Sequence, residues 1–366
     1  MRRLTVVQLL PAMHAGGVER STLEIAAALV AAGHASHVIS AGGRLLPALE
    51  AAGSTHHALA IGAKSLATPF RIFALRRLLR AIRPDVVHAR SRLPAWLALG
   101  ALRGLSPRPA FVTTMHGLHS PGRYSSVMTR GDAVICVSDT VRAHLRAHWP
   151  DADRRVTVIP RGVDPLQFPR RARPDIGARA AVFDELALPA DTRLLLMPGR
   201  GTRLKGHADA IALLAALRVE GVPAALWLLG SDEPGREAYL AELRALAAAS
   251  GVAGWLRLSP PRAEVVRAYA ASDLVLQLSR QPEAFGRTVI EALAVGAPVL
   301  GWAHGGVGEQ LAVLQPEGAV PLGDATALLA RARAVLAEPP APPSRIPYTL
   351  AAMQQATLDL YARHAG

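Results

Sequence analysis

The sequence predicts an α/β protein with two domains, each built on a parallel sheet. The chain has 366 residues, of which 51% are hydrophobic, so it is long enough to bury two cores. Short apolar runs alternate with helical stretches, the alternation stops in a segment rich in Pro, Arg and Gly, and it then resumes. This alternation is typical of βαβ units, in which helices connect parallel strands.

The expected N-terminal domain spans residues 1–165. Its first strand, residues 4–10, follows two arginines and alternates toward a glycine turn, which favours a strand over a signal peptide. Later strand-like runs, each followed by a helical stretch, are HASHVISA, DVVHA, AFVTTM and DAVICVS. The single Cys136 lies in the last run, which excludes an internal disulfide and indicates a buried structural thiol. We therefore expect a cytoplasmic protein.

The alternation breaks at residues 156–177, and we place a linker at residues 166–192. The expected second domain, residues 193–346, contains the strand-like runs RLLLMPGR, AALWLLG, GWLRLSP, DLVLQLS and APVLGW. A proline-rich stretch ends this domain. The last residues, 347–366, have the pattern of an amphipathic helix that returns toward the N-terminal domain.

Positive charge is concentrated in the first half of the chain. Residues 1–165 carry 21 Arg and Lys against 9 Asp and Glu, whereas the remainder carries 20 against 19. The excess indicates an anionic surface or partner for that half. Arg71, Arg76, Arg77 and Arg80 alternate with Ile and Leu as in a helix that lies on an anionic membrane. An ordinary solvated surface helix explains the same pattern.

Two other classes of protein are disfavoured by composition. No uninterrupted run of about 18 apolar residues is present, which argues against a transmembrane helix. Aromatic residues are only 4% of the chain and do not interleave with the basic segments, so we expect no nucleic-acid partner.

The segment 279–300 is the most informative about function. It follows a buried strand, and a polar loop at 280–286 leads into a helix that Gly296 ends. Glu283 lies in the loop and Glu291 lies about one turn inside the helix, so the two carboxylates are too far apart to share acid–base work. They suit opposite ends of an extended ligand, such as the sugar and ribose hydroxyls of a nucleotide-sugar. The alternative is that these glutamates bind no ligand and lie near the helix start only because the helix dipole favours acidic side chains there.

Backbone N–H groups at the start of that helix would attract phosphate or sugar oxygens. The expected donor-binding residues there are Phe285, Gly286, Arg287 and Thr288.

Other strand ends carry further candidates. Arg200 and Lys205 follow a strand, and two cations at the mouth of a parallel sheet suit a diphosphate. The loop lacks the Gly-Lys-Ser/Thr ending of a nucleoside triphosphatase. Gly16 and Gly17 follow the first strand and would let a ligand approach the backbone, but no G-x-G-x-x-G of a dinucleotide enzyme is present.

His116 ends another strand and could contact a ligand, although a structural histidine fits equally well. Weaker candidates are His14, His88, His119, His304 and the glycine turn Gly305, Gly306 and Glu309 after the last expected strand. Nothing in the sequence requires a metal. The isolated aspartates Asp151 and Asp153 are typical of a turn.

Taken together, these motifs resemble the retaining GT-B glycosyltransferases of the bacterial family four type. The resemblance covers nearly the whole chain and rests on the Gly-Gly-x-Glu turn, TMHG, VIPRGVD, the GRxxxKG loop, EAFGRTVIEALAVGAPV, GGVGE and the tail helix. It implies two facing Rossmann-like domains, a C-terminal helix that packs back across the domains, and no bound metal or permanent cofactor.

The resemblance also implies roles for single residues. Arg200 and Lys205 would hold the diphosphate, Glu291 the ribose, and Glu283 with the backbone of residues 284–287 the transferred sugar. His116 would contact that sugar from the other domain, and Gly16 with Gly17 would admit phosphates or acceptor. The sequence departs from the family at Arg161, where asparagine is frequent, and at Ala284, where proline or glycine is frequent.

The implied reaction moves a hexose-type residue from a nucleotide diphosphate-sugar to an acceptor hydroxyl and keeps the anomeric configuration. A UDP-sugar is the first assumption for the donor. The basic N-terminal half favours a lipid-linked or lipopolysaccharide-type acceptor at the inner membrane face, with peripheral membrane association. A soluble small-molecule or glycan acceptor, a sugar-nucleotide epimerase, and a catalytically silent basic binding or scaffold protein stay open.

Overall fold

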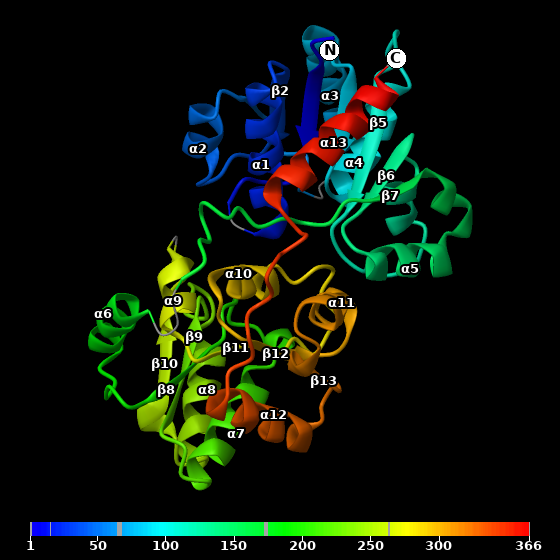
Figure 1. The fold of residues 1–366 in the computed structure, drawn as a ribbon. Coiled ribbons are helices and arrows are strands. Elements are labelled where there is room, and N and C mark those ends of the chain that lie inside the picture. The colour runs from blue at the N-terminus through cyan, green and yellow to red at the C-terminus, as the bar shows by residue number, and fades with distance from the viewer. Residues whose placement is uncertain (1, 15, 64–67, 172–174, 263, 366) are drawn as a thin grey trace. The chain divides into compact units, whose positions relative to one another are not determined.

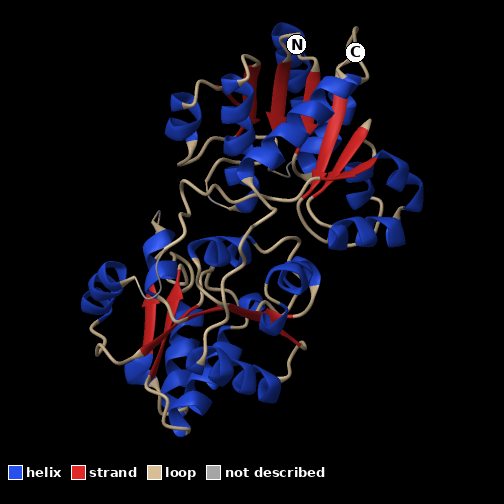
Figure 2. Ribbon diagram, in the orientation of Figure 1, coloured by secondary structure: helices blue, strands red, loops and turns tan. Residues whose placement is uncertain are grey.

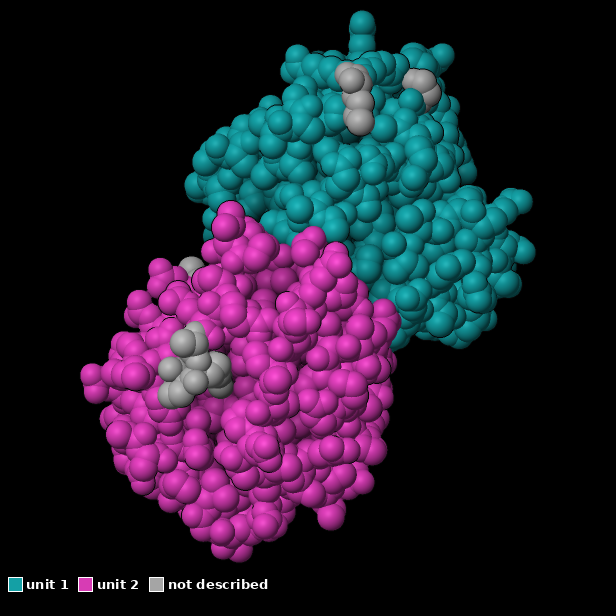
Figure 3. Space-filling model, in the orientation of Figure 1, with its two compact units in different colours: residues 1–161, 350–366 teal, residues 162–349 magenta. Residues whose placement is uncertain are grey.

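The computed structural model describes residues 2–14, 16–63, 68–171, 175–262 and 264–365 (Figures 1 and 2). The chain forms two compact units. Unit 1 comprises Met1–Arg161 and Leu350–Gly366, and unit 2 comprises Gly162–Thr349, coloured teal and magenta in Figure 3.

Unit 1 is built on a parallel sheet with the strand order β3-β2-β1-β4-β5-β6-β7. The strands are β1 Thr5–Leu9, β2 Ala35–Ser40, β3 Thr55–Ala58, β4 Val86–Ala89, β5 Ala110–Met115, β6 Ala133–Cys136 and β7 Val156–Val158. Strands β4, β5 and β6 are buried along their whole length. Their sequences are therefore nearly continuous apolar runs, as parallel strands covered on both faces require.

Helices cover the sheet of unit 1 (Figure 2). They are α1 Gly17–Ala31, α2 Leu46–Ala51, α3 Thr68–Ile82, α4 Arg92–Leu102, α5 Asp139–His148 and the C-terminal α13 Leu350–His364, with short 3₁₀ helices η1 Ser125–Thr129 and η2 Pro150–Arg155. Helix α13 places Met353, Leu360 and Tyr361 in the same core as Leu4 and Ile25. The tail helix thus packs on unit 1.

Unit 2 has a second parallel sheet with the order β10-β9-β8-β11-β12-β13. Its strands are β8 Arg193–Leu196, β9 Ala224–Leu229, β10 Leu256–Ser259, β11 Leu274–Gln277, β12 Val299–Trp302 and β13 Ala319–Val320. Its helices are α6 Ile176–Leu186, α7 His207–Val219, α8 Glu237–Ala249, α9 Val265–Ala271, α10 Arg287–Val295, α11 Gly305–Leu314 and α12 Ala325–Ala337, with η3 Arg203–Lys205, η4 Ala253–Trp255 and η5 Pro316–Gly318.

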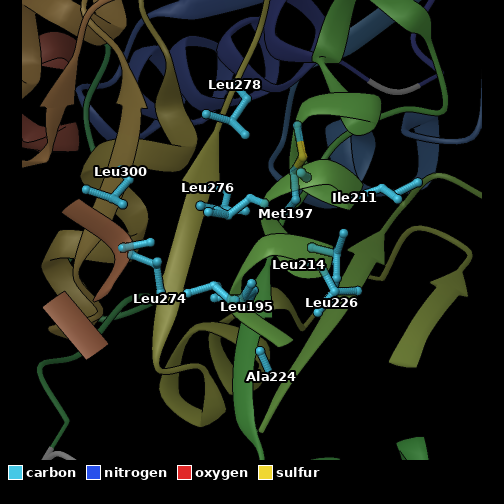
Figure 4. Close-up of a cluster of buried hydrophobic side chains, with 14 of the residues drawn as sticks. Leu195, Met197, Ile211, Leu214, Ala224, Leu226, Leu274, Leu276, Leu278 and Leu300 are labelled. Carbon is cyan, nitrogen blue, oxygen red and sulfur yellow. The ribbon is translucent and has the colours of Figure 1, made fainter. Parts of the chain in front are cut away.

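The core of unit 2 lies between the sheet and its helices. Leu195, Leu226 and Leu276 come from three neighbouring strands and meet Ile211 and Leu214 of α7 (Figure 4). These side chains are at most 1% exposed, and burying one of them fully stabilises the fold by about 1.5 to 3 kcal/mol. This core holds the strand ends that carry the candidate site.

The structure differs from the linker expected at residues 166–192. Residues 176–186 form helix α6, whose start is capped by the Asp175 side chain accepting from the Ala178 N–H. Phe183 and Leu186 of this helix are buried. The chain passes from unit 1 to unit 2 between Arg161 and Gly162, so this segment belongs to unit 2.

Both sheets reverse their strand order once. The reversal lies between β1 and β4 in unit 1 and between β8 and β11 in unit 2. In doubly wound sheets, ligands bind outside the carboxyl ends of the strands at this position. The loops after β1 and β4, and those after β8 and β11, are therefore the places to look for a site.

Candidate active site

The loop after β8 positions Lys205. It runs through Arg200, which is exposed, and the 3₁₀ helix η3 to Gly206, which starts α7 in the left-handed region with φ 78°. A Cβ on Gly206 would lie 2.0 Å from the carbonyl oxygen of Leu278, so only glycine lets this turn lie against the end of β11. Lys205 is thereby held beside the loop after β11.

Glu283, in that second loop, meets Lys205 directly. The Lys205 Nζ donates to Glu283 Oε1 at 2.5 Å, and the Ser279 Oγ lies 2.7 Å from the same oxygen. Burial alone would raise the pKa of Glu283, but the Lys205 ammonium and the hydrogen bonds from Lys205 and Ser279 outweigh it and hold the pKa below its usual range. Glu283 is therefore a carboxylate at neutral pH.

The glycine turn at Gly305 and Gly306 supports this loop from behind. The Gly306 N–H donates to the Glu283 carbonyl at 2.7 Å, and a Cβ on Gly306 would lie 2.5 Å from the Phe285 Cα. The turn begins helix α11, and the strand β13 follows it, so it does not come after the last strand of the sheet as expected. Its glycines allow the backbone of this turn to pack closely against the backbone of the loop that carries Glu283.

Helix α10 starts next to Glu283. Gly286 precedes it in the left-handed region, with φ 86°, and the first N–H groups of such a helix are available to anions. The Gln277 Nε2 donates to Thr288 Oγ1 at 2.8 Å, which ties this helix start to the end of β11. Phe285 is only 5% exposed and packs edgewise on Tyr348, so its side chain serves as an anchor.

Glu291 lies further along α10 and is 6% exposed. The hydroxyl of Tyr269, on α9, donates to Glu291 Oε2 at 3.1 Å. Sequence reasoning missed Tyr269, Ser279 and Gln277, because a polar group inside an apolar run carries no signal of which carboxylate or helix it will meet.

In unit 1, Gly16 precedes helix α1 and Gly17 is its first residue. Gly16 has φ 144°, and a Cβ there would lie 2.6 Å from Glu19 Oε2. Among the described residues, a Cβ on Gly17 would meet nothing within 4 Å. The side of Gly17 that a Cβ would occupy is thus open among these residues, which is compatible with a ligand at this helix end.

His116 follows β5 and is half-buried. The Arg161 Nη2 lies 2.7 Å from its Nδ1. Burial, then the charges of Arg161 and Arg90, hold the pKa of His116 well below its usual range. His88 is fully buried between the Tyr361 hydroxyl and Thr114, which is a structural position.

The other weaker candidates have structural contacts. His119 accepts through its carbonyl from His144 Nε2 at 2.8 Å, and the His304 Nε2 donates to the Ser279 carbonyl at 2.8 Å. Asp153 is engaged by Arg142 and Arg146. Within the described residues, no group of three or more His, Cys, Asp or Glu side chains could hold a metal ion.

The arginines of α3 divide into two kinds. Arg76 donates to the carbonyls of Gly100 and Ala101, and Arg80 to that of Gly104, so both cap the end of α4. Arg71 donates to the carbonyl of Ala63, and Arg77 is exposed. Beside them, Phe70 and Phe73 are 72% and 64% exposed. Among the helices of the described chain, none has the length and apolar character needed to cross a bilayer.

Two family models match successive halves of the chain. Residues 15–166 match the model of Glycosyltransferase Family 4, and residues 178–349 match that of Glycosyl transferases group 1. Among curated proteins, the chain is 32% identical over 245 residues to a D-inositol 3-phosphate glycosyltransferase of Xylanimonas cellulosilytica, covering 61% of this chain and 56% of that protein.

A protein of the same name from Nocardiopsis dassonvillei is 34% identical over 192 residues, covering 50% of this chain and 42% of that protein. The chain thus spans about half the length of the curated relatives that it matches.

Solved structures confirm the fold. A glycosyltransferase from Rickettsia africae superposes with a TM-score of 0.84 at 24% identity, over 99% of both chains. HepE from Anabaena, solved with UDP and glucose, superposes with a TM-score of 0.78 at 18% identity, over 98% of this chain and all of that one. The predicted GT-B architecture, with two Rossmann-like parallel-sheet domains, is therefore correct.

Proposed function

Because the chain belongs to the glycosyltransferases of family 4 and group 1, we propose that it is a retaining enzyme. It transfers a hexose-type residue from a nucleotide diphosphate-sugar to an acceptor hydroxyl. The observation that supports this most is the contact between Lys205 and Glu283 at the switch point of the unit 2 sheet. It brings a cation and an ionised carboxylate to the place where such sheets bind nucleotides.

The donor site would work by electrostatics. Lys205 and Arg200 stabilise the charge that grows on the leaving diphosphate, and the start of α10 offers N–H groups to its oxygens. Glu283 holds hydroxyls of the transferred sugar, and the buried Glu291 accepts from the ribose hydroxyls. These cations supply the positive charge that the leaving group needs, so we propose that the reaction is metal-independent.

Retention would follow from a front-face route. The bond from the anomeric carbon to the leaving phosphate oxygen breaks, and the acceptor oxygen bonds to the same face. The acceptor's proton passes to the departing phosphate oxygen. Glu283 is engaged by both Lys205 and Ser279, which suits a group that holds hydroxyls rather than one that attacks carbon. His116 is proposed to contact the transferred sugar.

Lys205→Ala tests the donor site. We expect a loss of transfer of about 10²-fold or more in a chain that still folds, with a lower unfolding temperature because the ion pair with Glu283 is lost as well. Arg203→Ala is the matched control, since this neighbouring cation pairs with the exposed Glu242. Full activity in Lys205→Ala would refute the proposed role. Thermal shifts with UDP, GDP, ADP and their sugars would identify the base, because a ligand of the folded form raises the midpoint.

For the acceptor, we propose a lipid-linked or lipopolysaccharide-type glycan reached from an anionic membrane surface on the cytoplasmic side. The supporting observation is the outer face of α3, where Phe70 and Phe73 are exposed beside Arg77. Apolar rings between arginines favour anionic bilayers. Flotation with anionic liposomes should carry the protein, and a Phe70→Ser, Phe73→Ser double variant should float far less.

Val219→Ser is the control for that experiment, because Val219 is a similarly exposed apolar residue, 88% exposed, at the end of α7. Equal flotation of all variants, or no flotation of the natural chain, would reject the membrane surface.

A soluble acceptor is the second candidate. It is supported by the curated relatives, which are named D-inositol 3-phosphate glycosyltransferases. Product formation with D-inositol 3-phosphate in the absence of any lipid would favour it over the glycolipid. Donor consumption without any acceptor would instead indicate an epimerase, and no consumption at all a binding protein.

A further inference from the structure

Arg161 occupies an unusual position for a charged side chain. It lies after β7, at the end of the chain segment that builds unit 1, and it is only 6% exposed. Its Nη2 lies 2.7 Å from His116 Nδ1 and 3.5 Å from His116 Nε2, and its Nη1 lies 3.7 Å from the Met353 sulfur on α13. A guanidinium is therefore held against the ring of a basic residue.

This contact restricts the protonation of His116. A guanidinium only donates hydrogen bonds and keeps its proton in proteins. The ring nitrogen that faces it must therefore offer a lone pair, which an imidazolium lacks. The shorter of the two distances is to Nδ1, so the lone pair belongs there and the ring proton belongs on Nε2.

The surroundings of His116 act in the same direction. Arg90 is 2% exposed, and its Nε donates to Gln8 Oε1 at 2.8 Å. His88 is held between Tyr361 and Thr114, and His119 is the remaining titratable neighbour. The groups that act on the ring are thus basic, and each adds to the cost of a second proton on it.

We propose that Arg161 is a positioning residue that keeps His116 a neutral imidazole with its proton on Nε2, so that the ring presents a fixed N–H donor to a ligand oxygen. The identity of that oxygen, a hydroxyl of the transferred sugar, rests on the proposed function. The fixed tautomer does not rest on it. The departure from asparagine at this position then has a physical consequence, because the charge of arginine adds to the burial that already disfavours the imidazolium, and it also orients the ring.

Nitrogen-15 NMR of the histidine rings in the full chain tests the tautomer without any substrate. The His116 signals are assigned by their loss in His116→Gln. We expect Nδ1 to resonate as an unprotonated and Nε2 as a protonated nitrogen, with no titration between about pH 5 and 8. A ring protonated on Nδ1, or an imidazolium at neutral pH, would overturn the proposal.

Two variants separate charge from hydrogen bonding. Arg161→Gln keeps an N–H donor without the charge, so the tautomer should persist while the titration moves up toward the ordinary histidine range. Arg161→Met removes both, so the two tautomers should mix as well. An Arg161→Met ring that stays fixed and untitrated would contradict the role of Arg161. The natural chain tests the tautomer even if the methionine variant does not fold.

Activity provides the second readout. In the pH profile of sugar transfer, the natural chain should show no loss of activity in acid that arises from His116. The Arg161→Gln variant should lose activity as the pH falls and His116 becomes protonated, because its KM for the donor rises. If His116→Ala transfers sugar at the natural rate, the proposed sugar contact fails. The NMR result still decides the role of Arg161 in that case.

Discussion

Glu283 shows how a single carboxylate can be kept ionised while it is largely covered. Its ion pair with Lys205 holds its pKa below the ordinary value, so the stabilisation that the pair gives is present above the pKa of the unfolded chain, about 4.3. It is lost as the pH falls through the lower folded value. The direction is the usual one for a paired acid.

From this sign we predict that Glu283→Gln costs about 1 to 3 kcal/mol of unfolding free energy at neutral pH and progressively less in acid. Urea unfolding of both proteins between about pH 3 and 7 measures the difference. Glu264→Gln is the control, since this side chain is 83% exposed. A pH-independent difference would show that the ionised pair does not stabilise the fold.

Tyr269 is the residue whose role was hardest to foresee. Its hydroxyl reaches the buried Glu291 from another helix, so Tyr269→Phe removes one hydrogen bond to a carboxylate without changing shape. We expect a several-fold higher donor KM with kcat nearly unchanged, because Glu291 would hold the donor in the ground state and the transition state alike.

Tyr239→Phe is the comparison, since its hydroxyl contacts His207 and not a glutamate. An equal rise in KM for both variants would mean that Tyr269 acts on packing in general. The charged residues, in contrast to Tyr269, were predictable, because charges directly after apolar runs must lie at the edge of a parallel sheet.

Among the strands, burial decided which could be predicted. The central strands were visible as apolar runs because helices cover both of their faces. The three that the sequence did not show, β3, β7 and β13, are edge strands. Strand β3 has no buried residue, and β13 has only two residues, so neither carries an apolar pattern. Pairing with a neighbour, and not their own side chains, makes them strands.

Helix α6 was hidden for a related reason. The prolines and arginines around it are typical of a linker, and its apolar residues gain their meaning only from contact with unit 2. Helix α6 buries Val182, Phe183 and Leu186. Its Arg179 guanidinium pairs with Asp273, which directly precedes β11. Such long-range partners are not visible in a local pattern.

The turn that begins α7 gives a prediction at this scale. Gly206→Ala places a Cβ in the left-handed region and 2.0 Å from the Leu278 carbonyl oxygen, so the turn must shift and carry Lys205 with it. An alanine in the left-handed region costs roughly 1 to 2 kcal/mol by itself. We expect Gly206→Ala to lower the free energy of unfolding by well above that amount and to reduce sugar transfer.

Gly221→Ala is a close control, because Gly221 has φ 82° and, in the part of the chain that the structure describes, nothing lies within 4 Å of a Cβ built on it. Unfolding and transfer assays on both variants separate strain from displacement. Similar results for the two would mean that the contact with β11 does not position Lys205.

At the scale of the whole chain, the two units differ in how many chain segments build them. Unit 2 is one continuous segment, whereas unit 1 needs both the first 161 residues and the last helix. Charge is also divided, since the first half of the chain carries nearly all of the positive excess. The sequence predicted both the two domains and the uneven distribution of charge, because each of these features depends on long segments of the chain and not on single contacts.

Helix α13 therefore should matter to unit 1 alone. Removing residues 350–366 exposes the core that Met353, Leu360 and Tyr361 complete, and leaves the buried His88 without its tyrosine partner. Three such side chains contribute about 4.5 to 9 kcal/mol, which is comparable with the stability of a whole domain. In scanning calorimetry we expect the transition of unit 1 to disappear or to move far down, while that of unit 2 stays in place.

Tyr361→Phe distinguishes packing from hydrogen bonding in that experiment, since it keeps the ring in the core and removes only the hydroxyl that contacts His88. It should lower the unit 1 transition by a few degrees, because one buried hydrogen bond contributes about 1 kcal/mol. A truncated chain that keeps both transitions would show that unit 1 folds without its last helix. A simultaneous loss of both would show that the tail supports unit 2 as well.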